Sequence, residues 1–160
     1  MKVYFAGDHA GFEMKQELME FVRGLGHEVE DMGPLEPKSG DDYSDYVIPL
    51  AKKVAKGAPF AAKGVPFGVR GIVVAGSGQG EIIAMNRIKG ARGALLAPGP
   101  QMVPLIIASR DHNDSNIFSI GARFCTLEEA KKAITVWLET PFSNAERHIR
   151  RLQKNDVYGS

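Results

Sequence analysis

The residues best suited to chemistry in this 160-residue chain form a Gly-x-Gly-x-Gly loop directly after the β-branched run 72–74. Gly76, Gly78 and Gly80 let the backbone turn sharply and bring its N–H groups close to a ligand. Glu81 then stands at the first position of a predicted helix. Because a helix N-terminus presents unpaired N–H groups and a positive dipole end, this loop can hold negative charge beside a group that carries a proton. A plain strand-to-helix turn without a ligand is the alternative.

The spacing of the loop excludes two common phosphate-binding motifs. A Walker loop requires Gly-x-x-x-x-Gly-Lys-Ser/Thr, and no lysine follows the glycines here. A dinucleotide fingerprint requires Gly-x-Gly-x-x-Gly with an acidic residue about 20 residues further on. Here the third glycine comes one residue early, and the next acidic residue after Glu81 is Asp111. The loop therefore belongs to neither class.

Two further polar segments contain candidate site residues. Asp8 and His9 end the first predicted strand between glycines. Asp8 either caps the first helix or accepts a hydrogen bond from a substrate hydroxyl, in which case His9 faces an anion or a ring oxygen. His112 and Asn113 follow the fourth predicted helix, where a solvated turn is the alternative to a site. His112 is the best-placed general acid by residue type, because imidazole titrates near neutrality.

Cationic side chains near the C-terminus could bind a phosphate. Arg147 and Arg151 are four residues apart and share one face of the last predicted helix, together with His148 and Arg150 nearby. Two arginine forks suit a phosphate dianion, although a solvated basic helix has the same pattern. Arg123, after the fifth predicted strand, adds a further cation.

A carboxylate base, an acid, backbone N–H donors and a phosphate clamp form a consistent chemical set. Together they suit abstraction of a proton next to a carbonyl, with the resulting enediolate held by the N–H groups. These donors can carry the developing charge, so the sequence predicts that no metal is needed.

The elements that position these residues alternate along the chain. The periodicity predicts strands at 3–6, 27–31, 71–75, 91–96 and 116–120, and helices at 12–25, 43–56, 81–87, 102–109, 127–138 and 144–154. Such alternation gives a parallel sheet covered on both faces, with ligands beyond the carboxyl ends of its strands. Three polar loops should therefore share one rim and bind a small molecule: 7–11, 76–81 and 121–123.

The composition is that of one globular domain covering residues 1–160. Hydrophobic residues make up 44% and charged residues 24%, and the net charge is +1, so neither nucleic acid nor an anionic membrane is a predicted partner. No apolar run approaches the ~20 residues of a membrane span. The single cysteine, Cys125, excludes an internal disulfide and a cysteine-based metal site. The N-terminus lacks the pattern of a signal peptide, so a cytoplasmic location is expected.

Five segments in register resemble the ribose-5-phosphate isomerase B family, which includes galactose-6-phosphate isomerase subunits. The resemblance covers nearly the whole chain and rests on these segments: 7–12, 76–80, 110–116, 121–123 and 140–151. It implies a Rossmann-like three-layer αβα sandwich with a five-stranded parallel sheet. It also implies interconversion of an aldose phosphate and a ketose phosphate through a cis-enediolate, without a cofactor. Family members are homodimers or homotetramers with active sites shared between two subunits, so the helix at about 144–155 is expected to pack on a partner subunit or reach into it.

The resemblance assigns roles to individual residues. Asp8 and His9 match the family's substrate-contacting pair, His112 matches the acid that opens the sugar ring, and Asn113 matches a substrate ligand beside it. The enediolate-holding loop and the ligand-binding arginines correspond to Gly76, Ser77, Gly78, Gln79, Gly80, Arg123, Arg147 and Arg151. Ser77 stands where many members have threonine, and it is included among the predicted catalytic residues.

One departure from the family pattern decides which residue is the predicted base. Many members carry a catalytic cysteine where this chain has Ala75, whereas a second branch uses the glutamate of Gly-Ser-Gly-x-Gly-Glu. Glu81 matches that glutamate. Its pKa is pulled down by the helix N-terminus and up by burial.

The substrate stays open at this point. Segments 57–69 and 97–101 are longer than is usual in the family, and the second could reshape the sugar pocket. Ribose 5-phosphate is the first expectation. A hexose or tetrose phosphate, or a non-catalytic sugar-phosphate-binding module, is the alternative.

Overall fold

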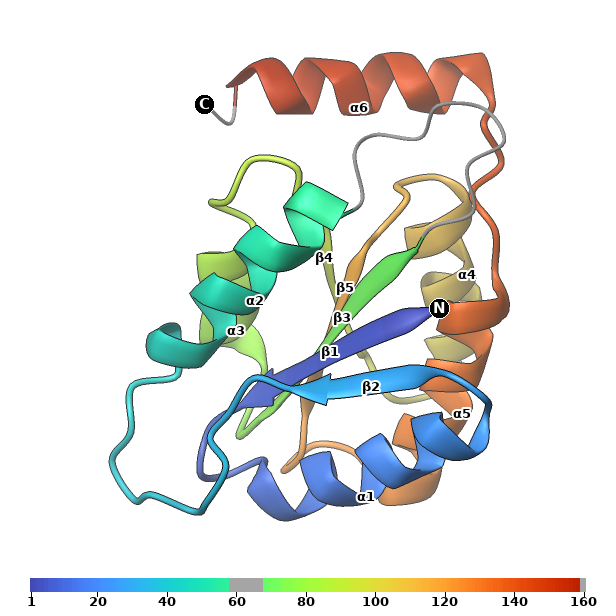
Figure 1. Ribbon diagram of the computed structural model, residues 1–160. Helices are drawn as coiled ribbons and strands as arrows, with labels where there is room; N and C mark the ends of the chain where they lie inside the picture. The colour runs from blue at the N-terminus through green and yellow to red at the C-terminus, as the bar shows by residue number, and fades with distance from the viewer. Residues whose placement is uncertain (58–67, 159–160) are drawn as a thin grey trace.

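The computed structural model describes residues 1–57 and 68–158 (Figure 1). Its centre is a parallel five-stranded sheet with the strand order β2-β1-β3-β5-β4. The strands are β1 (Lys2–Gly7), β2 (Glu28–Asp31), β3 (Val69–Ala75), β4 (Gly93–Leu95) and β5 (Ile117–Gly121). The predicted αβα fold class is confirmed. Most of the long segment 57–69 lies outside the described residues.

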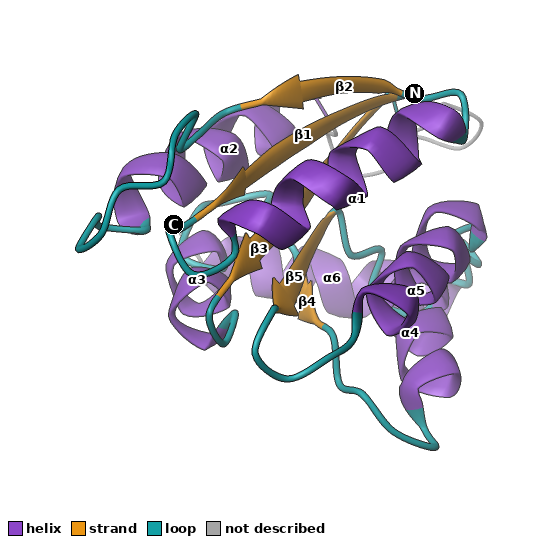
Figure 2. Cartoon of the chain, turned by 90° about the horizontal axis from the view of Figure 1, so that it is seen from below, coloured by secondary structure: helices purple, strands orange, loops and turns teal. Residues whose placement is uncertain are grey.

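Helices cover both faces of the sheet, as Figure 2 shows from the carboxyl side of the central strands. One face packs against α1 (Phe12–Gly24), α4 (Met102–Asp111) and α5 (Leu127–Glu139), and the other against α2 (Ser44–Gly57) and α3 (Gln79–Met85). Alternate residues of β1 enter the two cores: Val3 and Phe5 lie in the first, Tyr4 and Ala6 in the second. This two-sided burial explains the near-continuous apolar runs of the central strands.

A last helix, α6 (Glu146–Tyr158), lies apart from the two helical layers. It crosses the amino end of the sheet, opposite the loops that follow β1, β3 and β5 (Figure 1). Its buried side chains, His148 and Leu152, anchor an otherwise exposed helix. Within the described ranges, no helix has the length and apolar character needed to cross a membrane.

Helix α3 begins two residues earlier than the sequence predicts. Gly78 adopts a left-handed conformation, with φ of 75°, and acts as the N-cap, so helical geometry starts at Gln79. Glu81 is therefore the third helical residue and not the first. Strand β4 is also shorter than predicted, with three residues in place of 91–96.

Candidate active site

The loops after β1, β3 and β5 converge at the carboxyl edge of the sheet. They form an open pocket of about 470 Å³ together with residues from the start of α2. Its lining residues are Asp8, His9, Ala10, Tyr43, Gly76, Ser77, Gly80, Glu81, Arg123 and Phe124. The structure thus brings seven predicted site residues into one pocket, namely Asp8, His9, Gly76, Ser77, Gly80, Glu81 and Arg123.

Asp8 joins the first two of these loops. Its Oδ1 accepts a hydrogen bond from the Gly11 N–H at 2.9 Å, and its Oδ2 accepts one from the Gly76 N–H at 3.4 Å. The N-cap of α1 is Gly11, with no side-chain cap, so Asp8 does not cap that helix in the predicted way. A Cβ at Gly11 would lie 2.1 Å from the Val74 carbonyl oxygen, so only glycine allows the loop after β1 to approach strand β3 this closely.

The glycine loop offers several backbone donors to the pocket. Within the described part of the chain, the amides of Ser77, Gly78 and Gly80 donate no hydrogen bond, whereas the Gln79 N–H donates to Ser77 Oγ at 3.3 Å. Ser119 of β5 fixes the loop, because its hydroxyl donates a hydrogen bond to the Gly78 carbonyl at 2.8 Å. Fixed, unpaired N–H groups of this kind can stabilise an oxyanion without reorganising.

Glu81 is the buried acid of the site, with only 4% of the residue exposed. Burial raises the pKa of its carboxyl group, the negative charge of Asp8 adds to the effect, and a hydrogen bond to its own backbone N–H opposes them. Burial therefore has the larger effect, and the net shift of the Glu81 pKa, which the sequence left open, is upward. A carboxylate with a raised pKa is a stronger base, which suits proton abstraction near neutral pH.

Two aromatic residues at the pocket were not among the predicted site residues. The Tyr43 hydroxyl oxygen lies 2.8 Å from where a Cβ of Gly80 would be, so the ring packs directly against the loop. Phe124 is 67% exposed beside Arg123. Tyr43 could have been found from the rule already used for the other loops, because it ends the segment that follows β2 and that segment also starts at the carboxyl edge.

Four other predicted site residues lie at the opposite edge of the sheet: His112, Asn113, Arg147 and Arg151. His112 is the C-cap of α4, a helix that returns the chain to the amino ends of the strands, and Arg147 and Arg151 are exposed on α6. Asn113 lines a separate pocket of about 290 Å³ between α6 and residues 86–93. A single chain therefore does not bring the whole predicted set into one pocket.

His148 is not one of the exposed cations that the sequence suggested. It is 3% exposed, its ring centroid lies 4.5 Å from that of His112, and its Nδ1 lies 3.0 Å from Ser143 Oγ. Burial lowers its pKa, and Arg147 and His112 add to the effect. His148 therefore packs behind His112 as a mostly neutral ring.

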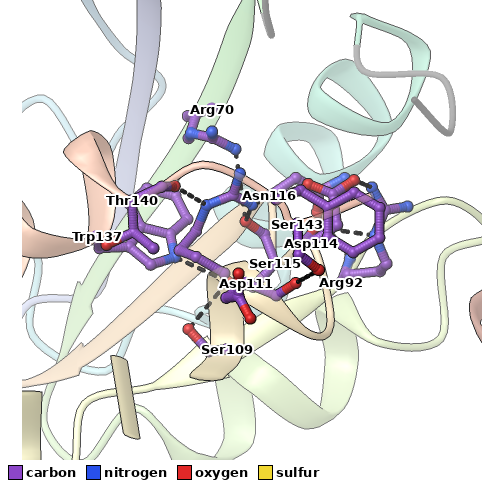
Figure 3. A network of polar contacts seen from close by, with 12 residues as sticks. Arg70, Arg92, Ser109, Asp111, Asp114, Ser115, Asn116, Trp137, Thr140 and Ser143 are labelled. Atoms are coloured by element: carbon purple, nitrogen blue, oxygen red, sulfur yellow. Dashed lines mark hydrogen bonds and ion pairs between the residues drawn. The ribbon is translucent and has the colours of Figure 1, made fainter. Parts of the chain in front are cut away.

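A buried polar network holds the turn that contains His112 and Asn113 (Figure 3). Asp114 follows the turn with a φ of 47°, and its carboxylate pairs with Arg110 at 3.0 Å and with Arg92 at 2.8 Å. Arg110 Nε also donates to the Thr140 carbonyl at 3.2 Å. The network ties both sides of the turn to the core, so His112 is presented from a rigid support even though its own side chain is exposed.

The described residues contain no group of three or more His, Cys, Asp or Glu side chains that could hold a metal ion. Cys125 is half-buried, and burial raises the pKa of its thiol to about 11. A thiol in such surroundings is a poor nucleophile.

The fold and the rim define a class: an α/β enzyme with a buried carboxylate, free loop amides and an arginine around one pocket for a small anionic molecule. A profile of the Ribose/Galactose Isomerase family matches residues 3–155, and the chain belongs to that family. Ribose-5-phosphate isomerase B of Mycobacterium tuberculosis is 38% identical over 152 residues, which cover 95% of this chain and 86% of the relative. The protein is accordingly an isomerase, as the sequence predicts.

Solved structures agree with this assignment. The type B ribose 5-phosphate isomerase of Trypanosoma brucei superposes with a TM-score of 0.84 at 33% identity, covering 98% of this chain and 97% of the other. Ribose-5-phosphate isomerase B of Mycoplasma genitalium with bound ribulose-5-phosphate gives a TM-score of 0.86 at 29% identity, covering 98% and 95%.

Proposed function

We propose that this isomerase interconverts ribose 5-phosphate and ribulose 5-phosphate through a cis-enediolate, with Glu81 as the base. The observation that carries the proposal is the buried Glu81 with a raised pKa, in one pocket with the unbonded amides of the glycine loop and with Arg123. The relatives named above are pentose phosphate isomerases, and one of them binds ribulose-5-phosphate.

In the proposed reaction, the Glu81 carboxylate takes the proton from C2 of the open-chain aldose. The electron pair left behind forms the C1–C2 double bond, and the carbonyl oxygen becomes the enediolate oxygen. The amides of Ser77, Gly78 and Gly80 hold this charge, and Asp8 binds a neighbouring hydroxyl. Glu81 then returns the proton to C1, and the hydroxyl proton on O2 passes to O1, so that C2 becomes the carbonyl carbon of the ketose and the Glu81 carboxylate is restored.

We further propose that the ring-opening acid and part of the phosphate clamp come from a second subunit. Glu81 and Arg123 lie at the carboxyl edge of the sheet, whereas His112, Arg147 and Arg151 lie at the amino edge. A homodimer with two-fold symmetry can place each edge against the other, so that His112 of the partner subunit reaches the sugar ring. The openness of the pocket in one chain and the rigid support of His112 both favour this arrangement.

The first experiment is turnover of ribose 5-phosphate by purified, metal-stripped protein in the presence of EDTA. Sustained conversion to ribulose 5-phosphate is the expected result. A panel of pentose, hexose and tetrose phosphates compared by kcat/KM tests the choice of sugar, because pocket length acts differently on each. Tight binding of sugar phosphates without exchange of the C2 proton into solvent would contradict an enzymatic role and favour a binding module.

A further inference from the structure

Asp41 makes a pair of contacts with His9 that bind a loop to the rim of the site. Asp41 Oδ1 accepts a hydrogen bond from the His9 backbone N–H at 3.2 Å and lies 2.7 Å from His9 Nδ1. The Asp41 side chain is 2% exposed, whereas the His9 side chain is 39% exposed at the pocket. The carboxylate is therefore covered, and the ring that it holds is open to a ligand.

These contacts determine where the proton of the His9 ring lies. An ionised carboxylate only accepts hydrogen bonds, so a nitrogen at 2.7 Å must carry a proton. His9 then has Nδ1–H whether the ring is neutral or charged, and Nε2 is the nitrogen that remains for a ligand. The backbone contact fixes the same loop from a second direction, so the ring has little freedom to turn over.

Asp41 stands on a segment that is anchored at both ends. At its start, the buried Lys15 Nζ donates to Asp31 Oδ1 at 2.6 Å and to the Pro34 carbonyl at 2.7 Å. At its end, Tyr43 packs against Gly80 of the glycine loop. The carboxylate thus has a defined place although it comes 32 residues after His9 in the chain.

We propose that Asp41 is a positioning residue that pairs with the His9 Nδ1–H and so supports the doubly protonated ring, whose Nε2–H donates a hydrogen bond to the anionic group of the substrate. Arg123 lines the same pocket as His9, which makes this side of the pocket suitable for a phosphate. The identity of the bound anion as a sugar phosphate rests on the proposed function; the control of the ring by Asp41 does not.

The first test reads the His9 ring directly by NMR of protein with ¹⁵N-labelled histidine, assigned with His9→Gln. In the wild type, His9 is expected to be protonated at Nδ1 with and without inorganic phosphate. In Asp41→Asn, the tautomer protonated only at Nε2 should become populated, because the amide can donate to Nδ1. Identical His9 signals in wild type and Asp41→Asn would overturn the proposal. If Asp41→Asn does not fold, Asp41→Ser takes its place with the same expectation.

The second test separates positioning from general structural damage. Asp41→Asn should raise KM for ribose 5-phosphate about tenfold and leave kcat within about threefold. This pattern is expected when the lost interaction stabilises the bound substrate and the transition state equally. In the His9→Gln background, Asp41→Asn should have no further effect on KM, because Asp41 acts through that ring. Fully additive effects would contradict this. Glu36→Gln removes one exposed charge from the same loop and should change neither constant.

The two proposals fail in different ways. If the wild type does not isomerise ribose 5-phosphate, the proposed function fails, and the dissociation constant for inorganic phosphate then replaces KM in the same double-mutant cycle. If the wild type is active but the His9 tautomer and the KM do not respond to Asp41, only the role of Asp41 fails.

Discussion

Glu81 combines two properties at the scale of a single residue: it is buried among the loops of the site, and its pKa is raised. Asp8 contributes to the second property while its own oxygens are occupied by the amides of Gly11 and Gly76. The two carboxylates thus differ in their surroundings, since Asp8 is held by backbone donors and Glu81 is desolvated. This difference favours Asp8 as a fixed acceptor and Glu81 as the group that exchanges a proton.

Glu81→Gln should abolish turnover and leave phosphate binding intact. The amide has nearly the same shape but cannot accept the C2 proton, so kcat should fall by about 10³-fold or more. Binding of inorganic phosphate should stay within about twofold, because the arginine side of the pocket is unchanged. The measurement is steady-state kinetics alongside a phosphate titration. Isomerase activity that persists in the purified variant would exclude Glu81 as the base.

The same substitution should stabilise the fold at neutral pH. Because the pKa of Glu81 in the folded chain lies above its ordinary value of 4.5, the folded state binds more protons between the two pKa values, and stability falls as pH rises through that window. Glu81→Gln removes this cost, and its melting temperature should exceed that of the wild type by on the order of 2 °C at pH 7. The difference should shrink near pH 4, where the wild-type carboxyl is protonated in both states. Equal melting temperatures at pH 7 would contradict the raised pKa.

At the scale of elements, the turn after α4 depends on a buried ionic network. Asp114 is shared by Arg110 and Arg92, and all three side chains are largely inaccessible to solvent. Since α4, the residue before β4 and the segment after α5 each contribute a partner, the network fixes the position of His112 relative to the amino edge of the sheet.

Asp114→Asn should be strongly destabilising. Removing one partner of a buried ion pair costs about 3–5 kcal/mol, and asparagine tolerates the left-handed backbone here, so the loss reports on charge. Urea unfolding measures it, and Glu17→Gln, an exposed carboxylate on α1, is the matched control with an expected change within about 0.5 kcal/mol. A loss for Asp114→Asn that is no larger than that of the control would show that the network contributes little.

At the scale of the whole molecule, the sheet separates the predicted catalytic groups. The proposed base, Glu81, lies beyond the carboxyl ends of the strands, and the proposed acid, His112, lies beyond their amino ends. No motion within one layered α/β domain brings opposite ends of a packed sheet together, because the core between them is close-packed. An active site shared between two chains, as proposed above, would place Glu81 of one chain beside His112 of the other without any such motion.

The shared site predicts complementation between two inactive variants. Glu81→Gln and His112→Asn should each be inactive alone. A heterodimer of the two contains one site with both groups intact, so a statistical mixture should recover about a quarter of the wild-type activity. The measurement uses two affinity tags and subunit exchange. Recovery of no activity in isolated heterodimers would contradict a site composed of two subunits.

Much of the site could be predicted because it follows from local patterns. Residues directly after a strand lie at the carboxyl edge, which is why Asp8, Glu81 and Arg123 meet as expected. The same rule places residues directly after a helix at the amino edge, and it would have separated His112 from Glu81. Asp41 carries no local signal of its own, because its partner, His9, lies more than 30 residues away in the chain.

The sequence by itself determined the alternation of strands and helices, and with it the parallel sheet, because each element depends on periodicity among near neighbours. It also determined the glycine loop and the residue types around it. Only the tertiary structure decided that burial outweighs the opposing effects on the Glu81 pKa, that Asp41 contacts His9, and that Glu81 and His112 lie at opposite edges of the sheet. These outcomes depend on desolvation and on distances between segments remote in the chain, which no local pattern encodes.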